Sequence, residues 1–407
     1  MRSFVPQDAR EARQAFVTGH AGSSLLETTV LILTAPLLLL AHAKVTSKSR
    51  AFNDILFVAL PLLVAYTVAP DAISVYAIPV LCAVSMFVLE SPAPLGAERE
   101  PDRAVTTLRG IVVLSTVICI LAVDFTVFPR RLAKTEWTGT GLMDIGVGAF
   151  CFTGAIVPRR RAWSVGRTLT AIVPLYVLGM ARFAAIKLSN YQEHVSEYGV
   201  HWNFFFTLIV VRVALDIVTA LAPQGRVVVG CAVLTAYQAA LSLTPLGAWI
   251  MDDGPREHTR MVWQNKEGLA SAVGYAGLSM LANGVAASRP VPSTRDYAAA
   301  CAVAWAALLC CVYGLQLPVS RRQCNLSFVL WIYAEGATML LMAHAGLDSA
   351  STLMRALSVR QLAVFLGANL LTGAVNVAME TMAAPPLTAL AVLSLYVVAV
   401  CGFALRV

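Results

Sequence analysis

Apolar runs of about 20 residues recur along the whole sequence, and a run of that length crosses roughly 30 Å of hydrocarbon as a helix. In lipid, every backbone N–H and C=O group must be hydrogen-bonded within the protein, so only helices and closed barrels span a membrane. These runs are too long and unbroken for the strands of a barrel. We therefore expect an all-α, polytopic membrane protein.

The runs predict about thirteen transmembrane helices within one transmembrane domain, residues 1–407. The sequence shows no convincing internal repeat, which weakens a transporter interpretation, because many transporter folds carry paired halves. The predicted spans are 24–43, 54–69, 72–90, 106–127, 141–157, 164–185, 203–222, 226–243, 268–287, 296–314, 324–344, 358–378 and 386–404.

Composition supports a membrane location. Hydrophobic residues make up 58% of the chain and charged residues only 13%, against about 25% charged residues in a soluble domain. The net charge of +7 mostly reports topology in a polytopic protein, so we expect no nucleic-acid partner. The nine cysteines lie mostly inside apolar runs and form no Cys-x-x-Cys pair, so we expect buried thiols and no metal site.

The hairpin between the fourth and fifth spans gathers more charge than a connector needs. It holds two acids and three bases: Asp124, Arg130, Arg131, Lys134 and Asp144. Ionisable groups at the edge of a span are costly, about 2.5–3.5 kcal/mol each near a helix centre, so they usually mark a site. A positively charged topology loop would explain the bases, but a topology signal needs no acid at Asp124.

A second polar segment, residues 190–206, runs straight into the seventh span. Its candidate substrate-binding residues are His194, Tyr198, His201 and Asn203. A metal site is conceivable here, but two histidines separated by six residues with flanking glutamates are not a specific ligand pattern. A lone intramembrane histidine is often only an interhelical hydrogen bond, yet for this pair we favour a site.

Two later loops add Asn265, Arg322 and Asn325 to the substrate-binding candidates. Asn325 also begins a glycosylation sequon, Asn325-Leu-Ser327, which abuts the eleventh span and which we interpret as structural.

The parity of the spans makes a further prediction. The loops after spans four, six, eight and ten share one side of the membrane, and these loops hold all the candidates above. We therefore expect the candidate residues to lie on one face. The basic residues of the opposite face indicate that this other face is cytoplasmic, and the motif face lumenal. They are Lys44, Lys48, Arg50, Arg99, Arg103, Arg159, Arg160, Arg161, Arg226, Arg289 and Arg295.

The hairpin residues suit acyl transfer. A carboxylate such as Asp124 can take a proton from a hydroxyl, and an ammonium such as Lys134 can hold a developing oxyanion. Lys134 follows ten residues later across the Pro129 turn and could fold back toward Asp124. No Gly-x-Ser-x-Gly elbow is present, so direct attack of an acceptor hydroxyl on a thioester fits better than a serine acyl-enzyme. Arg130 and Arg131 are suited to phosphate groups.

The alternative from another class is a polytopic lipid transporter or flippase, which would also collect intramembrane charges. A transporter needs no acid and base positioned for a hydroxyl, so chemistry would discriminate between the two. A membrane-bound O-acyltransferase of the other large family is weakened, because no single isolated histidine inside a span dominates.

Several unusual strings carry a family resemblance, in matching order over nearly the whole chain. They are FVTGHAGSSLLE, DFTVFPRRLAKTE, GTGLMDIGVG, NYQEHVSEYGVHWNFFFTL, NKEGLASAVGY and SRRQCNLSFVLW. The sequence resembles the GPI-anchor inositol acyltransferase family. It departs from the family pattern in shorter connecting loops and in Thr126, where a proline is expected.

The resemblance implies an enzyme of the endoplasmic reticulum membrane. Such enzymes move a fatty acyl group, typically palmitoyl, from acyl-CoA to the inositol ring of glucosaminyl-phosphatidylinositol. It also implies that Asp124 and Lys134 carry catalysis, the first on the inositol hydroxyl and the second at the thioester. Arg130, Arg131, His194 and His201 would line the donor and head-group pocket. We expect acyl-CoA as a co-substrate, membrane lipid as the surroundings, and no resident cofactor.

Overall fold

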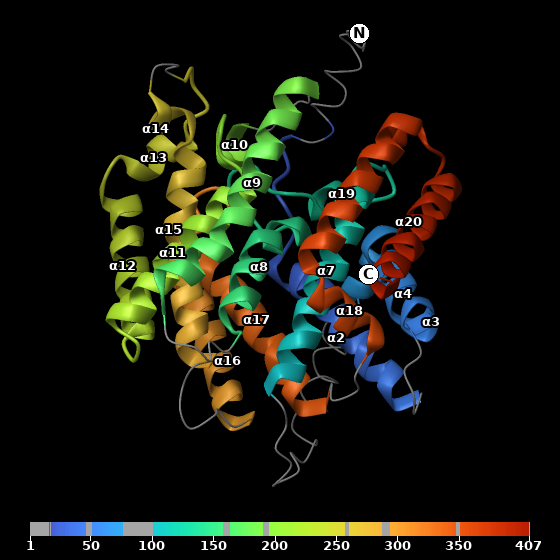
Figure 1. The fold of residues 1–407 in the computed structure, drawn as a ribbon, viewed down its shortest axis with the longest axis horizontal. Coiled ribbons are helices and arrows are strands. Elements are labelled where there is room, and N and C mark those ends of the chain that lie inside the picture. The colour runs from blue at the N-terminus through green and yellow to red at the C-terminus, as the bar shows by residue number, and fades with distance from the viewer. Residues whose placement is uncertain are drawn as a thin grey trace.

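The computed structural model describes residues 16, 18–45, 51–75, 101–157, 163–189, 195–256, 260–286, 294–346 and 351–406. Within these ranges the chain folds as a bundle of helices (Figure 1), and no strand longer than the isolated bridge between Ser23 and Thr140 is found there. The all-α fold class is confirmed.

The helices follow one another along the chain with short connections. The elements are α2 (Leu25–Val45), α3 (Ala51–Asp54), η1 (Ile55–Ala59), α4 (Leu60–Thr67), α5 (Pro70–Val75), α7 (Pro101–Ala122), η2 (Arg130–Leu132), η3 (Leu142–Asp144), α8 (Ile145–Ala155), α9 (Val165–Ser189), α10 (Val195–Tyr198), α11 (Phe204–Leu221), α12 (Arg226–Leu243), α13 (Leu246–Met251), α14 (Met261–Gln264), α15 (Lys266–Ala286), α16 (Thr294–Leu309), η4 (Cys310–Gly314), α17 (Leu326–Gly346), α18 (Thr352–Val359), α19 (Gln361–Ala378), η5 (Thr381–Ala383) and α20 (Pro386–Arg406).

Nine helices among the described residues are long and apolar enough to cross a membrane. Shorter apolar helices cover Ala51–Thr67 and Leu142–Ala155, and α9 occupies the sixth predicted span. The third predicted span, 72–90, begins in α5 and otherwise lies outside the described residues. The polytopic architecture is therefore confirmed, and the total of about thirteen stays a prediction.

Two predicted spans differ from the helices observed. The helix predicted over 106–127 runs from Pro101 and ends at Ala122, so Asp124 lies beyond the helix. Hydropathy misses this end because residues 123–128 are still mostly apolar. The span predicted over 358–378 is divided at Arg360 into the short helix α18 and the longer helix α19.

The bundle has a buried centre and a lipid-facing rim. Helices α7, α15 and α17 bury most of their spanning residues, whereas α12 and α19 bury few. The rim exposes large apolar side chains, as expected of surfaces that face hydrocarbon: Val173, Tyr176, Val228, Leu370, Val377 and Leu395.

Small residues let the central helices approach closely, as is common in membrane bundles. An added Cβ at Gly148 on α8 would lie 2.7 Å from Ile332 on α17, and one at Gly336 on α17 would lie 2.6 Å from Phe152 on α8. These two contacts fix α8 against α17, and both helices contribute walls to the cavity described below.

Candidate functional site

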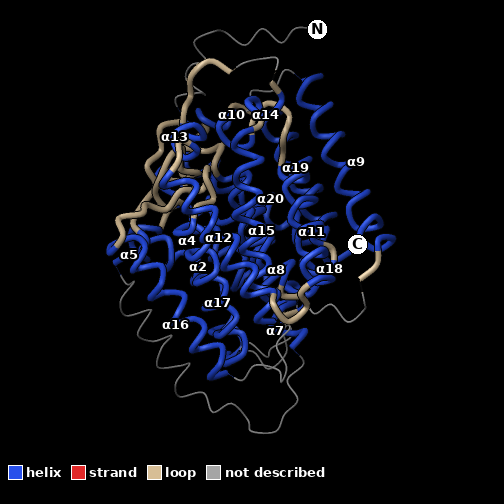
Figure 2. Tube along the Cα trace, turned by 90° about the vertical axis from the view of Figure 1, so that its left-hand side faces the viewer, coloured by secondary structure: helices blue, strands red, loops and turns tan. Residues whose placement is uncertain are grey.

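The loops that carry the sequence candidates meet at one end of the bundle, where Figures 1 and 2 both show α10, α13 and α14. The Ser320 hydroxyl donates to the Trp137 carbonyl oxygen at 2.8 Å, and the Trp137 indole donates to Asp253 at 3.1 Å. The Val200 N–H donates to the Gln264 carbonyl oxygen at 2.8 Å. The four loops therefore lie together, as the parity of the spans predicts.

Asp124 lies in the turn that directly follows α7, and Arg130 holds this turn in shape. The Arg130 guanidinium donates at 2.8–3.1 Å to three carbonyl oxygens of the turn, those of Val123, Phe125 and Phe128. It also lies 3.9 Å from the centre of the Phe16 ring. Burial lowers the pKa of Arg130 to about 10, against the opposing effect of Asp124. The geometry thus favours a structural role for Arg130 over phosphate binding.

The Asp124 carboxylate is oriented by α19. Its Oδ2 atom accepts a hydrogen bond of 2.7 Å from the Asn376 side-chain amide. The Asn376 carbonyl oxygen in turn accepts from the Thr381 hydroxyl at 3.3 Å, which sets the amide so that its N–H₂ group faces the carboxylate. A general base needs such a fixed position relative to the proton that it removes.

Lys134 pairs with Glu197 of α10, at 2.5 Å between Nζ and Oε1. Burial raises the pKa of Glu197, but the positive charges of Lys134, Arg321 and Arg182 outweigh it and lower the pKa to about 2. The carboxylate is therefore ionised at neutral and mildly acidic pH. The expected approach of Lys134 to Asp124 is not what the structure shows, since Lys134 faces α10 and Asp124 faces α19.

A cavity begins at this ion pair and runs between the helices. Its polar end is formed by Lys134, Glu197, Tyr198 and Arg182. Its walls are mostly apolar and come from α2, α7, α8, α17 and α19, with side chains that include Ile32, Val112, Ile145, Phe150, Met339 and Phe365. An apolar pocket with a few convergent polar groups at one end fits a hydrophobic chain joined to a polar reacting group.

Asp144 is buried and holds its own loop together. Its carboxylate accepts from the N–H and hydroxyl of Thr135, from the Gly141 N–H and from Arg321 Nε, all at 2.8–3.0 Å. Burial lowers the pKa of Arg321, but Asp144 and Glu197 outweigh it and raise the pKa. These contacts occupy the carboxylate, so the structure favours a structural role for Asp144 over the substrate-binding role expected from the sequence.

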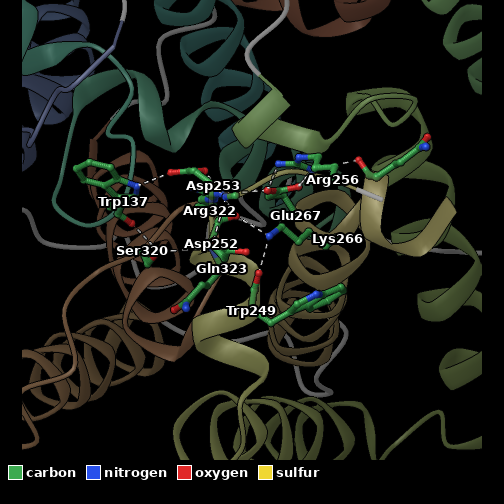
Figure 3. Close-up of polar contacts among 12 residues, drawn as sticks. Trp137, Trp249, Asp252, Asp253, Arg256, Lys266, Glu267, Ser320, Arg322 and Gln323 are labelled. Atoms are coloured by element: carbon green, nitrogen blue, oxygen red, sulfur yellow. Dashed lines mark hydrogen bonds and ion pairs between the residues drawn. The ribbon is translucent and has the colours of Figure 1, made fainter. Parts of the chain in front are cut away.

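Arg322 belongs to a buried charge network rather than to the cavity lining (Figure 3). Its Nη2 atom donates to Asp253 at 2.6 Å and to Glu267 at 3.1 Å. Arg256 donates to both oxygens of Glu267, at 2.6 and 2.9 Å. Removing one member of such a buried set leaves an uncompensated charge. Arg322 therefore locks the loop before α17 to the start of α15.

The three candidate asparagines serve backbone groups near the ends of helices. Asn203 is the N-cap of α11 and accepts from the Phe205 N–H at 3.0 Å. Asn265 accepts from the His201 N–H at 2.8 Å, and Asn325 accepts from backbone N–H groups on either side of it, where α17 begins. Such groups need side-chain acceptors because the first turn of a helix leaves its N–H groups unpaired.

The remaining candidates have varied surroundings. Arg131 pairs with Glu27 of α2 at 2.9 Å and with Asp71 of α5, which ties the hairpin to the first helices. Tyr198 lines the cavity, and burial raises its pKa. His201 packs edge-on against Phe183 outside this cavity. His194 lies outside the described residues.

Sequence reasoning missed two residues that the structure brings to the site. Arg182 lines the cavity, and its signal was a charge within a predicted span. Asn376 orients Asp124, but a single amide in an apolar helix gives no comparable signal, since polar side chains often serve helix packing alone.

Comparison with known proteins covers nearly the whole chain. The GWT1 family model matches residues 9–407. GPI-anchored wall transfer protein 1 of Emericella nidulans is 32% identical over 474 aligned positions, which cover 98% of this chain and 97% of that protein. Glucosaminyl-phosphatidylinositol-acyltransferase PIGW is 30% identical in Bos taurus, over 96% of both chains, and 33% identical in Homo sapiens, over 77% of this chain and 75% of that one. The chain belongs to the GWT1 family.

Proposed function

We propose that this protein is an acyl-CoA-dependent O-acyltransferase of GPI-anchor biosynthesis, which moves a fatty acyl group, palmitoyl in the first instance, to an inositol hydroxyl of glucosaminyl-phosphatidylinositol. The names of the mammalian relatives state this acceptor and this class of reaction. The observation that carries the proposal is the apolar cavity that ends at Lys134. A fatty chain in the cavity would present its thioester to the ammonium group.

The chemistry divides between two residues. The acceptor hydroxyl oxygen attacks the thioester carbonyl carbon, and Asp124 takes the hydroxyl proton as the C–O bond forms. Lys134 stabilises the charge that develops on the carbonyl oxygen. The C–S bond then breaks, the thiolate of CoA leaves and takes up a proton, and the new inositol ester remains. Glu197 keeps Lys134 charged and in place throughout, because its own carboxylate stays ionised.

An assay on purified protein tests this function. We expect radiolabelled palmitoyl-CoA and glucosaminyl-phosphatidylinositol to give a labelled, inositol-acylated lipid that resists release of its glycerol-linked chains by phospholipase A. An absence of product from well-folded protein would contradict the acceptor assignment. Product from a mannosylated intermediate alone would move the reaction to a later step, and movement of an intact lipid without acylation would favour a flippase.

We infer that the site faces the lumen of the endoplasmic reticulum. The span count and the basic residues of the opposite loops support this orientation. A glycosylation acceptor placed in the loop between α9 and α10 should therefore be modified in microsomes, whereas one in the loop between α15 and α16 should not. The reverse pattern would place the site in the cytosol, the compartment in which acyl-CoA is made.

A further inference from the structure

A second hollow lies on the outer side of the bundle, at the same end as the site. It is formed by α9, the segment between α10 and α11, α14 and α15, and its lining includes Met180, Phe183, His201, Trp202, Val262 and Leu269. We call it the lateral groove. Its volume of about 590 Å³ falls within the range of about 300–1,000 Å³ that ligand pockets occupy. The groove opens outward, because Met180 and Val262 are exposed.

One polar atom in this apolar wall has no partner among the described residues. The His201 Nδ1 atom is buried and accepts or donates no hydrogen bond there. The neighbouring Asn265 side chain cannot serve it, because its oxygen accepts from the His201 backbone and its nitrogen donates to the Met261 carbonyl oxygen. A buried polar atom without a partner costs about 1–3 kcal/mol. The groove therefore offers one hydrogen-bonding position within an apolar surface.

The groove and the cavity share a wall. Arg182 lines the cavity, and the next residue on α9, Phe183, lines the groove. Tyr198 lines the cavity, and His201, three residues on, lines the groove. The end of α9 and the segment from α10 to His201 thus separate two apolar chambers, and the Lys134–Glu197 pair lies at this partition.

We propose that the lateral groove holds the hydrocarbon chains of the glycerolipid acceptor, while the inner cavity holds the acyl chain of the donor; this rests on the function proposed above. A glycerolipid keeps its chains in the bilayer, so its site must open sideways to lipid, as the groove does. Its polar glycerol region can satisfy His201 Nδ1, and its head group then extends over α10 to Lys134. The inner cavity, bounded by helices of the buried centre, suits the single chain of a donor.

Filling the groove tests this assignment. Leu269 lines the groove, and Val273, one turn further along α15, does not; their exposed fractions are 37% and 38%, which makes them a matched pair. We expect Leu269→Trp to raise the KM for dipalmitoyl glucosaminyl-phosphatidylinositol about tenfold, since displacing about two methylene groups from apolar contact has that effect. Val273→Trp should leave this KM unchanged.

Two further arms identify the occupant. The same Leu269→Trp protein should keep the wild-type KM for palmitoyl-CoA and the wild-type rate with a tail-free acceptor, glycerophosphoinositol-glucosamine; these results also show that the variant is folded. A raised KM for palmitoyl-CoA would assign the groove to the donor and overturn the proposal. An unchanged KM for the dipalmitoyl acceptor would overturn it too, leaving the groove to ordinary bilayer lipid. If wild-type protein acylates neither acceptor, the proposed function fails rather than the groove assignment.

Discussion

Asp124→Asn is expected to lower the rate of inositol acylation by about 10²–10⁴-fold, the usual contribution of a general base. Asparagine keeps the size of the side chain and an oxygen that can accept from Asn376, which now donates at 2.7 Å. The Arg130 contacts that shape the turn go to backbone carbonyl oxygens and remain available. The variant should therefore fold and bind palmitoyl-CoA while failing to take the hydroxyl proton. Single-turnover assays with labelled palmitoyl-CoA measure the loss.

Two comparisons separate the base from its setting. Asp296→Asn removes an exposed carboxylate at the start of α16 and should leave the rate near that of the wild type. Asn376→Ala removes the orienting amide but keeps the base, so it should cost less than Asp124→Asn. Near-normal acylation by Asp124→Asn would refute the base assignment and leave Lys134 as the principal catalytic group.

The sequence predicted the arrangement better than it predicted the contacts. Runs of apolar residues identify spans because a helix in lipid must be apolar over its whole length, and parity then places the polar loops on one side. Ser320, Trp137 and Asp253, from three such loops, do meet. Neither argument needs to know which side chains touch.

The partners of the charged residues could not be predicted in this way. Lys134 pairs with Glu197, 63 positions away, and Asp124 contacts Asn376, 252 positions away, because helix packing brings these segments together. Asp144 and Asn325 were read as ligands, since polar residues beside spans often mark sites. The structure uses them for backbone N–H groups at turns and helix starts, a need that arises at every helix end.

Asp144→Ala is the sharpest test of that distinction between a ligand and a structural acid. The substitution removes a buried carboxylate that Arg321 contacts at 2.8 Å and leaves that guanidinium without its charge partner. Breaking a buried ion pair from one side typically costs about 3–5 kcal/mol. We expect a much lower thermal unfolding midpoint for the purified protein in detergent, together with poor expression.

A second substitution distinguishes the lost charge pair from lost substrate binding. Arg321→Met in the Asp144→Ala background removes the orphaned charge, and replacing both members of a buried pair by apolar groups is often neutral or stabilising. The double variant should therefore regain part of the lost stability, as a coupled pair requires. If Asp144→Ala alone instead unfolds like the wild type but raises the KM for acceptor, the carboxylate binds substrate, and the contacts to Thr135 and Gly141 are of secondary importance.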